Sequence, residues 1–144
     1  MPKVLLLLLF AAGAMRAEFL RMEVFIRDMN CPSCTDTLVA AFKKMRGVEH
    51  VEVDFKEGTV RLDLTAQNRV GLEQAWDAIK RVGFTPGETN VTVRGTVKAG
   101  KLEVPGIGKT FEIEGRAPEG DGVELKGAIT PPPDPRTPLK IRLR

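Results

Sequence analysis

The sequence has few residues that carry metal or covalent chemistry. Its 144 residues include only two cysteines and one histidine, and they show no hydrolytic or phosphate-binding constellation. We therefore expect a protein that is not an enzyme and that has no small-molecule substrate. An excess of one charge is also lacking, since the net charge is only +3. That balance gives little reason to expect a nucleic-acid partner.

Strong compositional bias is absent as well, which sets aside disordered and collagen-like classes. The length suits one domain or two small ones, and it leaves the oligomeric state open. No apolar run reaches the roughly 20 residues that span a bilayer.

Residues 1–17 have the features of a secretory signal peptide. Lys3 supplies the positive start, residues 4–12 form a short apolar run, and Ala12-Gly13-Ala14 is a small-residue cleavage pattern, with Ala17 as a second cleavage point. No cysteine follows the run directly, so a lipid anchor is not supported. Cleavage after Ala17 would leave 20 basic and 19 acidic residues. We expect an exported protein, periplasmic or extracellular, which is membrane-anchored if the segment is not cleaved.

Both cysteines lie in one stretch, Met29-Asn30-Cys31-Pro32-Ser33-Cys34. Two thiols at this spacing can share one soft metal ion or form a redox disulfide. A bridge across so short a loop constrains the unfolded chain little and makes a poor structural staple. The pair is therefore expected to be functional, and an oxidising compartment exposes it to disulfide formation.

The periodicity around this pair predicts an α+β fold. Alternation from Met22 to Arg27 predicts a strand, and helical spacing follows from Leu38 to Met45. Residues 51–64 predict a β-hairpin, residues 72–82 a second helix, and a fourth strand begins at Val91. The order β-α-β-β-α-β is that of the ferredoxin-like arrangement with an antiparallel sheet, and we assign it to residues 18–94.

Beyond residue 94 the helical periodicity disappears and glycine and proline become frequent. Residues 95–144 are predicted to form a small all-β extension of unknown role. At about 50 residues such a unit is marginal as an independent fold. Two placements are open, on the free face of the ferredoxin-like sheet or along its edge.

The motif Met29-x-Cys31-x-x-Cys34 after a first strand resembles the heavy-metal-associated domain of copper chaperones, metal-transporting P-type ATPases and periplasmic mercury-binding proteins. The resemblance covers about residues 22–94 and includes the hairpin that begins at Gly47-Val48 and the pair Gly83-Phe84 after the second helix. It implies that Cys31 and Cys34 are the metal ligands.

The resemblance also implies roles for the neighbours of the pair. Met29 matches a core residue that anchors the loop, and Phe84 matches a position that shields or tunes the metal site. Asp28 departs from the family's usual glycine, so the entry of the loop is expected to differ. Asn30 stands where zinc-preferring sites often have aspartate, which argues mildly against Zn(II).

The expected function is an exported protein that sequesters or transfers a soft heavy metal. Cu(I) is the expected metal, with Hg(II) and Zn(II) as alternatives, and a metal-transporting membrane protein or another metal carrier is the expected partner. A thiol–disulfide redox module is the second hypothesis, because Cys-Pro-Ser-Cys at a helix start permits it. The third is a non-catalytic interaction module that docks through residues 95–144.

Overall fold

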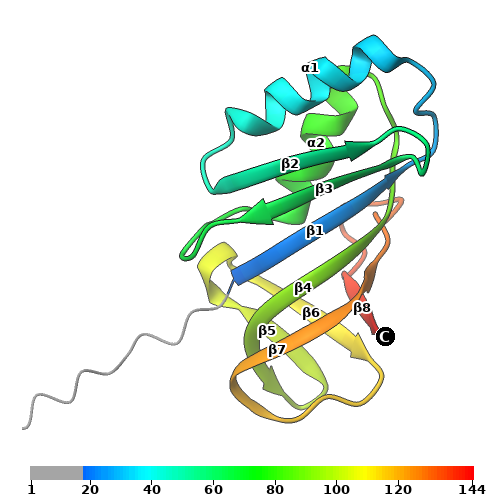
Figure 1. Ribbon diagram of the computed structural model, residues 1–144. Helices are drawn as coiled ribbons and strands as arrows, with labels where there is room; N and C mark the ends of the chain where they lie inside the picture. The colour runs from blue at the N-terminus through cyan, green and yellow to red at the C-terminus, as the bar shows by residue number, and fades with distance from the viewer. Residues whose placement is uncertain (1–17) are drawn as a thin grey trace, which may run out of the picture.

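The computed structural model describes residues 18–144, so the predicted signal peptide lies outside the described residues. None of the helices in this range is long and apolar enough to cross a bilayer. The elements follow one another (Figure 1) as β1 (Glu18–Ile26), α1 (Pro32–Lys43), β2 (Val48–Asp54), β3 (Thr59–Leu64), α2 (Leu72–Val82), β4 (Pro86–Lys98), β5 (Lys101–Val104), the 3₁₀ helix η1 (Pro105–Ile107), β6 (Lys109–Glu114), β7 (Gly120–Ile129) and β8 (Lys140–Leu143).

The first six elements form the predicted ferredoxin-like unit. Strands β2, β3, β1 and β4 lie side by side in that order, and every pair of neighbours is antiparallel. Both helices pack on one face of this sheet, as Figure 1 shows. The β-α-β-β-α-β prediction is confirmed for this part of the chain.

The alternation in β1 explains which face is covered. Met22, Val24 and Ile26 are buried beneath the helices, whereas Phe25 points to the opposite face and is 46% exposed. On α2 the buried side includes Trp76 and Ile79. This arrangement follows directly from the period of two in a strand and of 3.6 in a helix.

Strand β4 extends from the ferredoxin-like unit into the C-terminal part. One of its edges pairs with β1 as far as Arg94 and then with β5 from Thr96. Its other edge pairs with β7. The extension therefore lies along the edge of the sheet, which is one of the two placements that the sequence leaves open.

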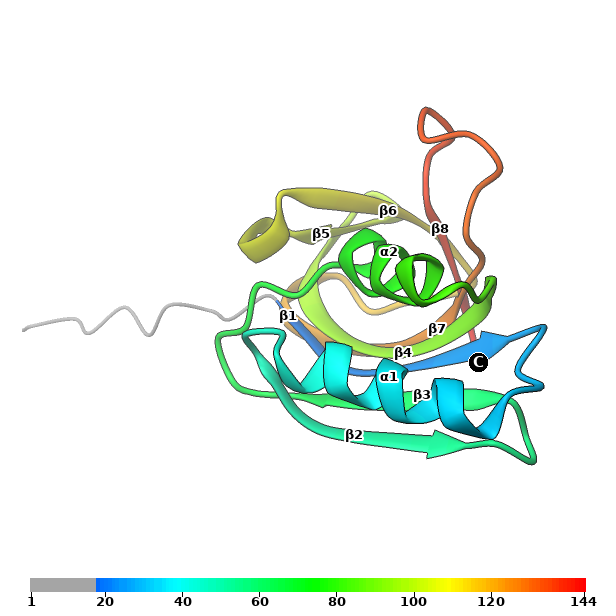
Figure 2. The same ribbon diagram turned by 90° about the horizontal axis from the view of Figure 1, so that it is seen from above.

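The strands of the C-terminal part close into a ring of pairings. The circuit runs from β4 through β5, β6, β8 and β7 back to β4, and β6–β8 is its one parallel pair among the described strands. Viewed from above, these strands curl around one another (Figure 2). Such closure pairs strand edges that would otherwise be exposed.

A single hydrophobic core serves both parts of the described chain. Phe19 of β1, Phe111 of β6 and Ile141 of β8 belong to the same buried cluster as the helix residues Phe42 and Ile79. The ferredoxin-like sheet and the C-terminal ring are thus packed as one body.

Candidate metal site

The cysteine pair lies where β1 gives way to α1. Cys31 is the N-cap residue of α1 in an extended conformation (φ −126°, ψ 103°), Pro32 begins the helix, and Cys34 lies in the first turn. The Cys34 N–H donates to the Cys31 carbonyl oxygen at 3.1 Å. Proline suits this start because its missing N–H has no partner within the helix in any case.

The two cysteines are joined by a disulfide, with their Cα atoms 5.3 Å apart. Both residues are half-buried, so the pair is accessible from outside. The Ser33 hydroxyl lies 3.3 Å from the Cys31 sulfur. After reduction, the same backbone holds two thiols close enough to share one ion.

These two sulfurs form a small donor set. Residues 18–144 contain no group of three or more histidine, cysteine, aspartate or glutamate side chains that is placed to hold a metal ion. His50, the single histidine, is exposed on β2. A two-sulfur site suits ions that accept low coordination numbers, whereas structural zinc takes four ligands.

The two residues predicted to surround the site lie on either side of it in the chain. Met29 precedes the pair and is half-buried against the main core. Phe84 follows α2 and is only 7% exposed. Gly83, at φ +102°, ends α2 in the left-handed conformation and turns the chain toward Phe84.

Hydrogen bonds bring the loop before the cysteines against the loop that carries Phe84. The Thr85 N–H donates to the Asp28 carboxylate at 2.9 Å, and the Thr85 hydroxyl lies 3.4 Å from the other oxygen of that carboxylate. The Arg27 N–H donates to the Thr85 carbonyl oxygen at 3.3 Å. Asp28 drew attention in the sequence because it replaces the glycine that is usual in the family. No pattern in the sequence pointed to Thr85 as its partner.

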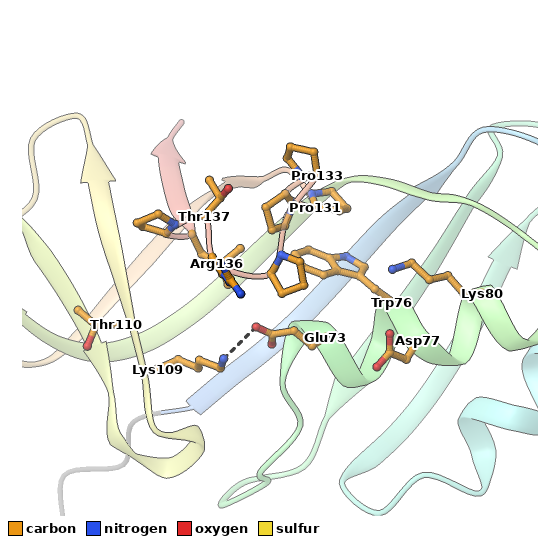
Figure 3. Close-up of a pocket in the computed structure, with 14 residues that line it drawn as sticks. Glu73, Trp76, Asp77, Lys80, Lys109, Thr110, Pro131, Pro133, Arg136 and Thr137 are labelled. Atoms are coloured by element: carbon orange, nitrogen blue, oxygen red, sulfur yellow. Dashed lines mark ion pairs between the residues drawn. The ribbon is translucent and has the colours of Figure 1, made fainter.

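A hollow lies between α2 and the proline-rich segment 131–139 (Figure 3), and its lining does not include the cysteine loop. Its volume is about 550 Å³, and the Lys109–Glu73 ion pair (3.1 Å) in its lining joins β6 to α2. Trp76 faces the prolines there, and the lining contains no cysteine, methionine or histidine. This hollow therefore offers no soft metal ligand.

Comparison with known proteins assigns the first part of the chain. The heavy-metal-associated domain matches residues 23–85. A copper chaperone CopZ of Staphylococcus haemolyticus is 36% identical over 59 residues, which is 41% of this chain and 85% of that protein.

Two solved structures show a partial likeness. The putative copper-ion-binding protein from Bacillus anthracis is 27% identical, over 51% of this chain and 99% of its own, with a TM-score of 0.40. The N-terminal domain of a potential copper-translocating P-type ATPase from Bacillus subtilis is 21% identical, over 49% and 84%, with a TM-score of 0.42. On the domain match and the chaperone relative, the chain belongs to the heavy-metal-associated domain family.

Proposed function

We propose that this protein binds Cu(I) through Cys31 and Cys34 and passes it to another protein. The observation that carries the proposal is the placement of two sulfurs together at the start of α1 within a heavy-metal-associated domain. The relative from Staphylococcus haemolyticus is a copper chaperone, which favours copper as the cargo.

The helix start suits this chemistry. The first turn of α1 carries the positive end of the helix dipole, which favours thiolate over thiol. Binding of Cu(I) releases the two thiol protons and forms two copper–sulfur bonds. A partner's thiolate then adds as a third ligand before one original bond breaks, so the ion moves without being free.

The disulfide determines whether the two cysteines can bind Cu(I). Cys31 and Cys34 are bonded to each other in the structure, and a disulfide offers no thiolate to the metal. Two electrons and two protons, supplied by a dithiol reductant, convert it to the two thiols. Metal loading is therefore proposed to depend on the redox state of the compartment.

Cu(I) is preferred over the alternative ions. Hg(II) also accepts two sulfur ligands and remains an alternative cargo. Zn(II) prefers four ligands, and Asn30, the residue before Cys31, is an exposed amide rather than a carboxylate. A third or fourth zinc ligand would have to come from a partner.

The carrier is proposed to act outside the cytoplasm. The signal-peptide features of residues 1–17 support export to the periplasm or beyond, or membrane anchoring if the segment stays attached. A carrier rather than an enzyme fits a site with two ligands and no general base. Its proposed partner is a metal-transporting membrane protein or a second metal carrier.

Titration of the reduced protein with Cu(I) under anaerobic conditions, against a competing copper chelator, tests the proposal. One Cu(I) should bind per chain in competition with the chelator, and Cys31→Ser and Cys34→Ser should each abolish that binding. Ser33→Ala is the matched control, because it alters the neighbour of the Cys31 sulfur and keeps both ligands. Cu(I) binding that survives both cysteine substitutions would refute the assignment.

The disulfide itself favours one second candidate, a thiol–disulfide exchange module. Such a module would cycle the Cys31–Cys34 bond with a substrate protein. The reduction potential of the Cys31–Cys34 disulfide, measured by equilibration with glutathione, tests this second function. A reduction potential below about −300 mV, typical of structural disulfides, would argue against redox catalysis.

A further inference from the structure

Asp28 joins two loops that the chain separates by more than fifty residues. Its carboxylate accepts the backbone N–H of Thr85 at 2.9 Å, and the Thr85 hydroxyl lies 3.4 Å from its second oxygen. A third link runs the other way, from the Arg27 N–H to the Thr85 carbonyl oxygen at 3.3 Å. We call these three contacts the loop clamp.

The loop clamp holds segments whose other ends are already fixed. On one side, Phe84 is buried and its N–H donates to the Ile79 carbonyl oxygen at 3.1 Å, which ties it to the end of α2. On the other side, the Ile26 N–H donates to the Gly58 carbonyl oxygen at 2.8 Å, which ties the end of β1 to the β2–β3 hairpin. Asp28 therefore connects two anchored segments.

Little chain separates the clamp from the cysteines. Only Met29 and Asn30 lie between Asp28 and Cys31, and Met29 is half-buried against the core. The clamp therefore lies three residues before Cys31, the N-cap of α1. A glycine at this position would have no carboxylate for Thr85 and would free the backbone.

We propose that Asp28 is a positioning residue for the cysteine pair, because its carboxylate holds the Phe84–Thr85 loop against the loop that carries Cys31. The proposal rests on the proposed function only in taking Cys31 and Cys34 as the functional pair. The carboxylate is the acceptor that holds the Thr85 N–H, so the loss of its oxygen atoms should loosen both loops.

The test compares three variants of the full, metal-free chain, so that failure of copper binding would not affect it. Asp28→Ala removes the charge and the two clamp contacts that the carboxylate makes, and leaves the backbone bond between Arg27 and Thr85. Asp28→Asn removes the charge and keeps an oxygen that accepts the Thr85 N–H. Asp36→Ala is the matched control, because Asp36 is an exposed aspartate two residues after Cys34 and has no side-chain hydrogen bond within residues 18–144.

Two rates are measured: hydrogen exchange of the Thr85 amide by NMR, and alkylation of the reduced cysteines by neutral iodoacetamide. Asp28→Ala should raise amide exchange about tenfold and alkylation about fivefold. Asp28→Asn and Asp36→Ala should stay within about twofold of the parent protein in both rates. The urea midpoint, measured alongside, shows whether each variant remains folded.

Three results would overturn the proposal. Asp28→Ala could leave Thr85 exchange unchanged, which would show that no clamp forms. It could speed exchange without changing alkylation, which would show that the clamp does not reach the cysteines. Finally, Asp28→Asn could match Asp28→Ala in alkylation, which would assign the effect to charge alone.

Discussion

Phe19 and Phe111 meet edge to face, with ring centroids 5.8 Å apart and planes at 89°. Phe19 belongs to β1 of the ferredoxin-like sheet and Phe111 to β6 of the C-terminal ring, and neither is more than 1% exposed. The contact joins residues on either side of residue 94, where the sequence predicts the end of the ferredoxin-like domain and the start of its β-rich extension. We infer that the two parts unfold together, which makes residues 95–144 a requirement for stability.

Removal of the Phe111 ring should destabilise the whole chain. Phe111→Ala is expected to lower the free energy of unfolding by about 3–5 kcal/mol, because it opens a cavity in a shared core. Urea unfolding followed at both tryptophan fluorescence and far-ultraviolet circular dichroism should give a single transition. Phe55→Ala, which removes a 43% exposed ring, is the control and should cost less than about 1 kcal/mol.

Separate transitions at the two probes would contradict the shared core. Trp76 reports on α2, so a fluorescence change that precedes the loss of strand signal would show that the ferredoxin-like part unfolds on its own. The boundary at residue 94 would then divide two independent units.

Gly95 is required where β4 changes partners. A Cβ at this position would lie 2.5 Å from the Glu103 carbonyl oxygen and 2.8 Å from the Leu102 side chain. Gly95→Ala must therefore push β5 away from β4, and we expect a loss of about 1–3 kcal/mol in the free energy of unfolding, or more.

Gly100→Ala is the control for that prediction. Gly100 has φ +73°, and a Cβ there meets nothing within 4 Å, so its replacement costs about 1 kcal/mol from backbone conformation alone. Urea unfolding of both variants gives the comparison. If both variants lose the same free energy of unfolding, the close approach of β5 to Gly95 does not contribute to stability.

The sequence predicted the ferredoxin-like part because its signals are local. The alternation of Met22, Val24 and Ile26 and the helical stripe of α2 each determine which face is buried. The cysteine pair was found for the same reason, since its spacing and its place before a helix can be read within six residues.

The remaining features depend on contacts between distant residues. The ring of strands needs Gly95 to let β5 approach and the parallel pairing of β6 with β8, and neither leaves a periodic pattern in the sequence. Thr85 is an ordinary loop residue until the fold brings it to Asp28. The placement of the extension and the loop clamp could therefore be described only from the structure.

A buried hydrogen bond ties α2 to β4. The Trp76 indole N–H donates to the Thr89 hydroxyl at 2.9 Å, and that hydroxyl donates in turn to the Gly87 carbonyl oxygen at 3.1 Å. Thr89 is completely buried. Thr89→Val keeps the shape but leaves the indole N–H without this partner, so it should cost about 1–3 kcal/mol.

A double-mutant cycle with Trp76→Phe checks this hydrogen bond. Once the indole is gone, Thr89→Val should cost less than it does in the parent protein, and the difference measures the coupling. Urea unfolding of the parent, both single variants and the double variant supplies the four free energies. Additive losses would show that the bond contributes nothing to stability.

Cys31 and Cys34 are proposed to form a Cu(I) site only after their disulfide is reduced. Two samples of the same preparation, one oxidised and one reduced and kept anaerobic, should be titrated with Cu(I) against the same chelator. The reduced protein should take up one Cu(I) per chain, and the oxidised protein should take up none. Equal uptake by the two samples, or no uptake by the reduced one, would contradict the proposal.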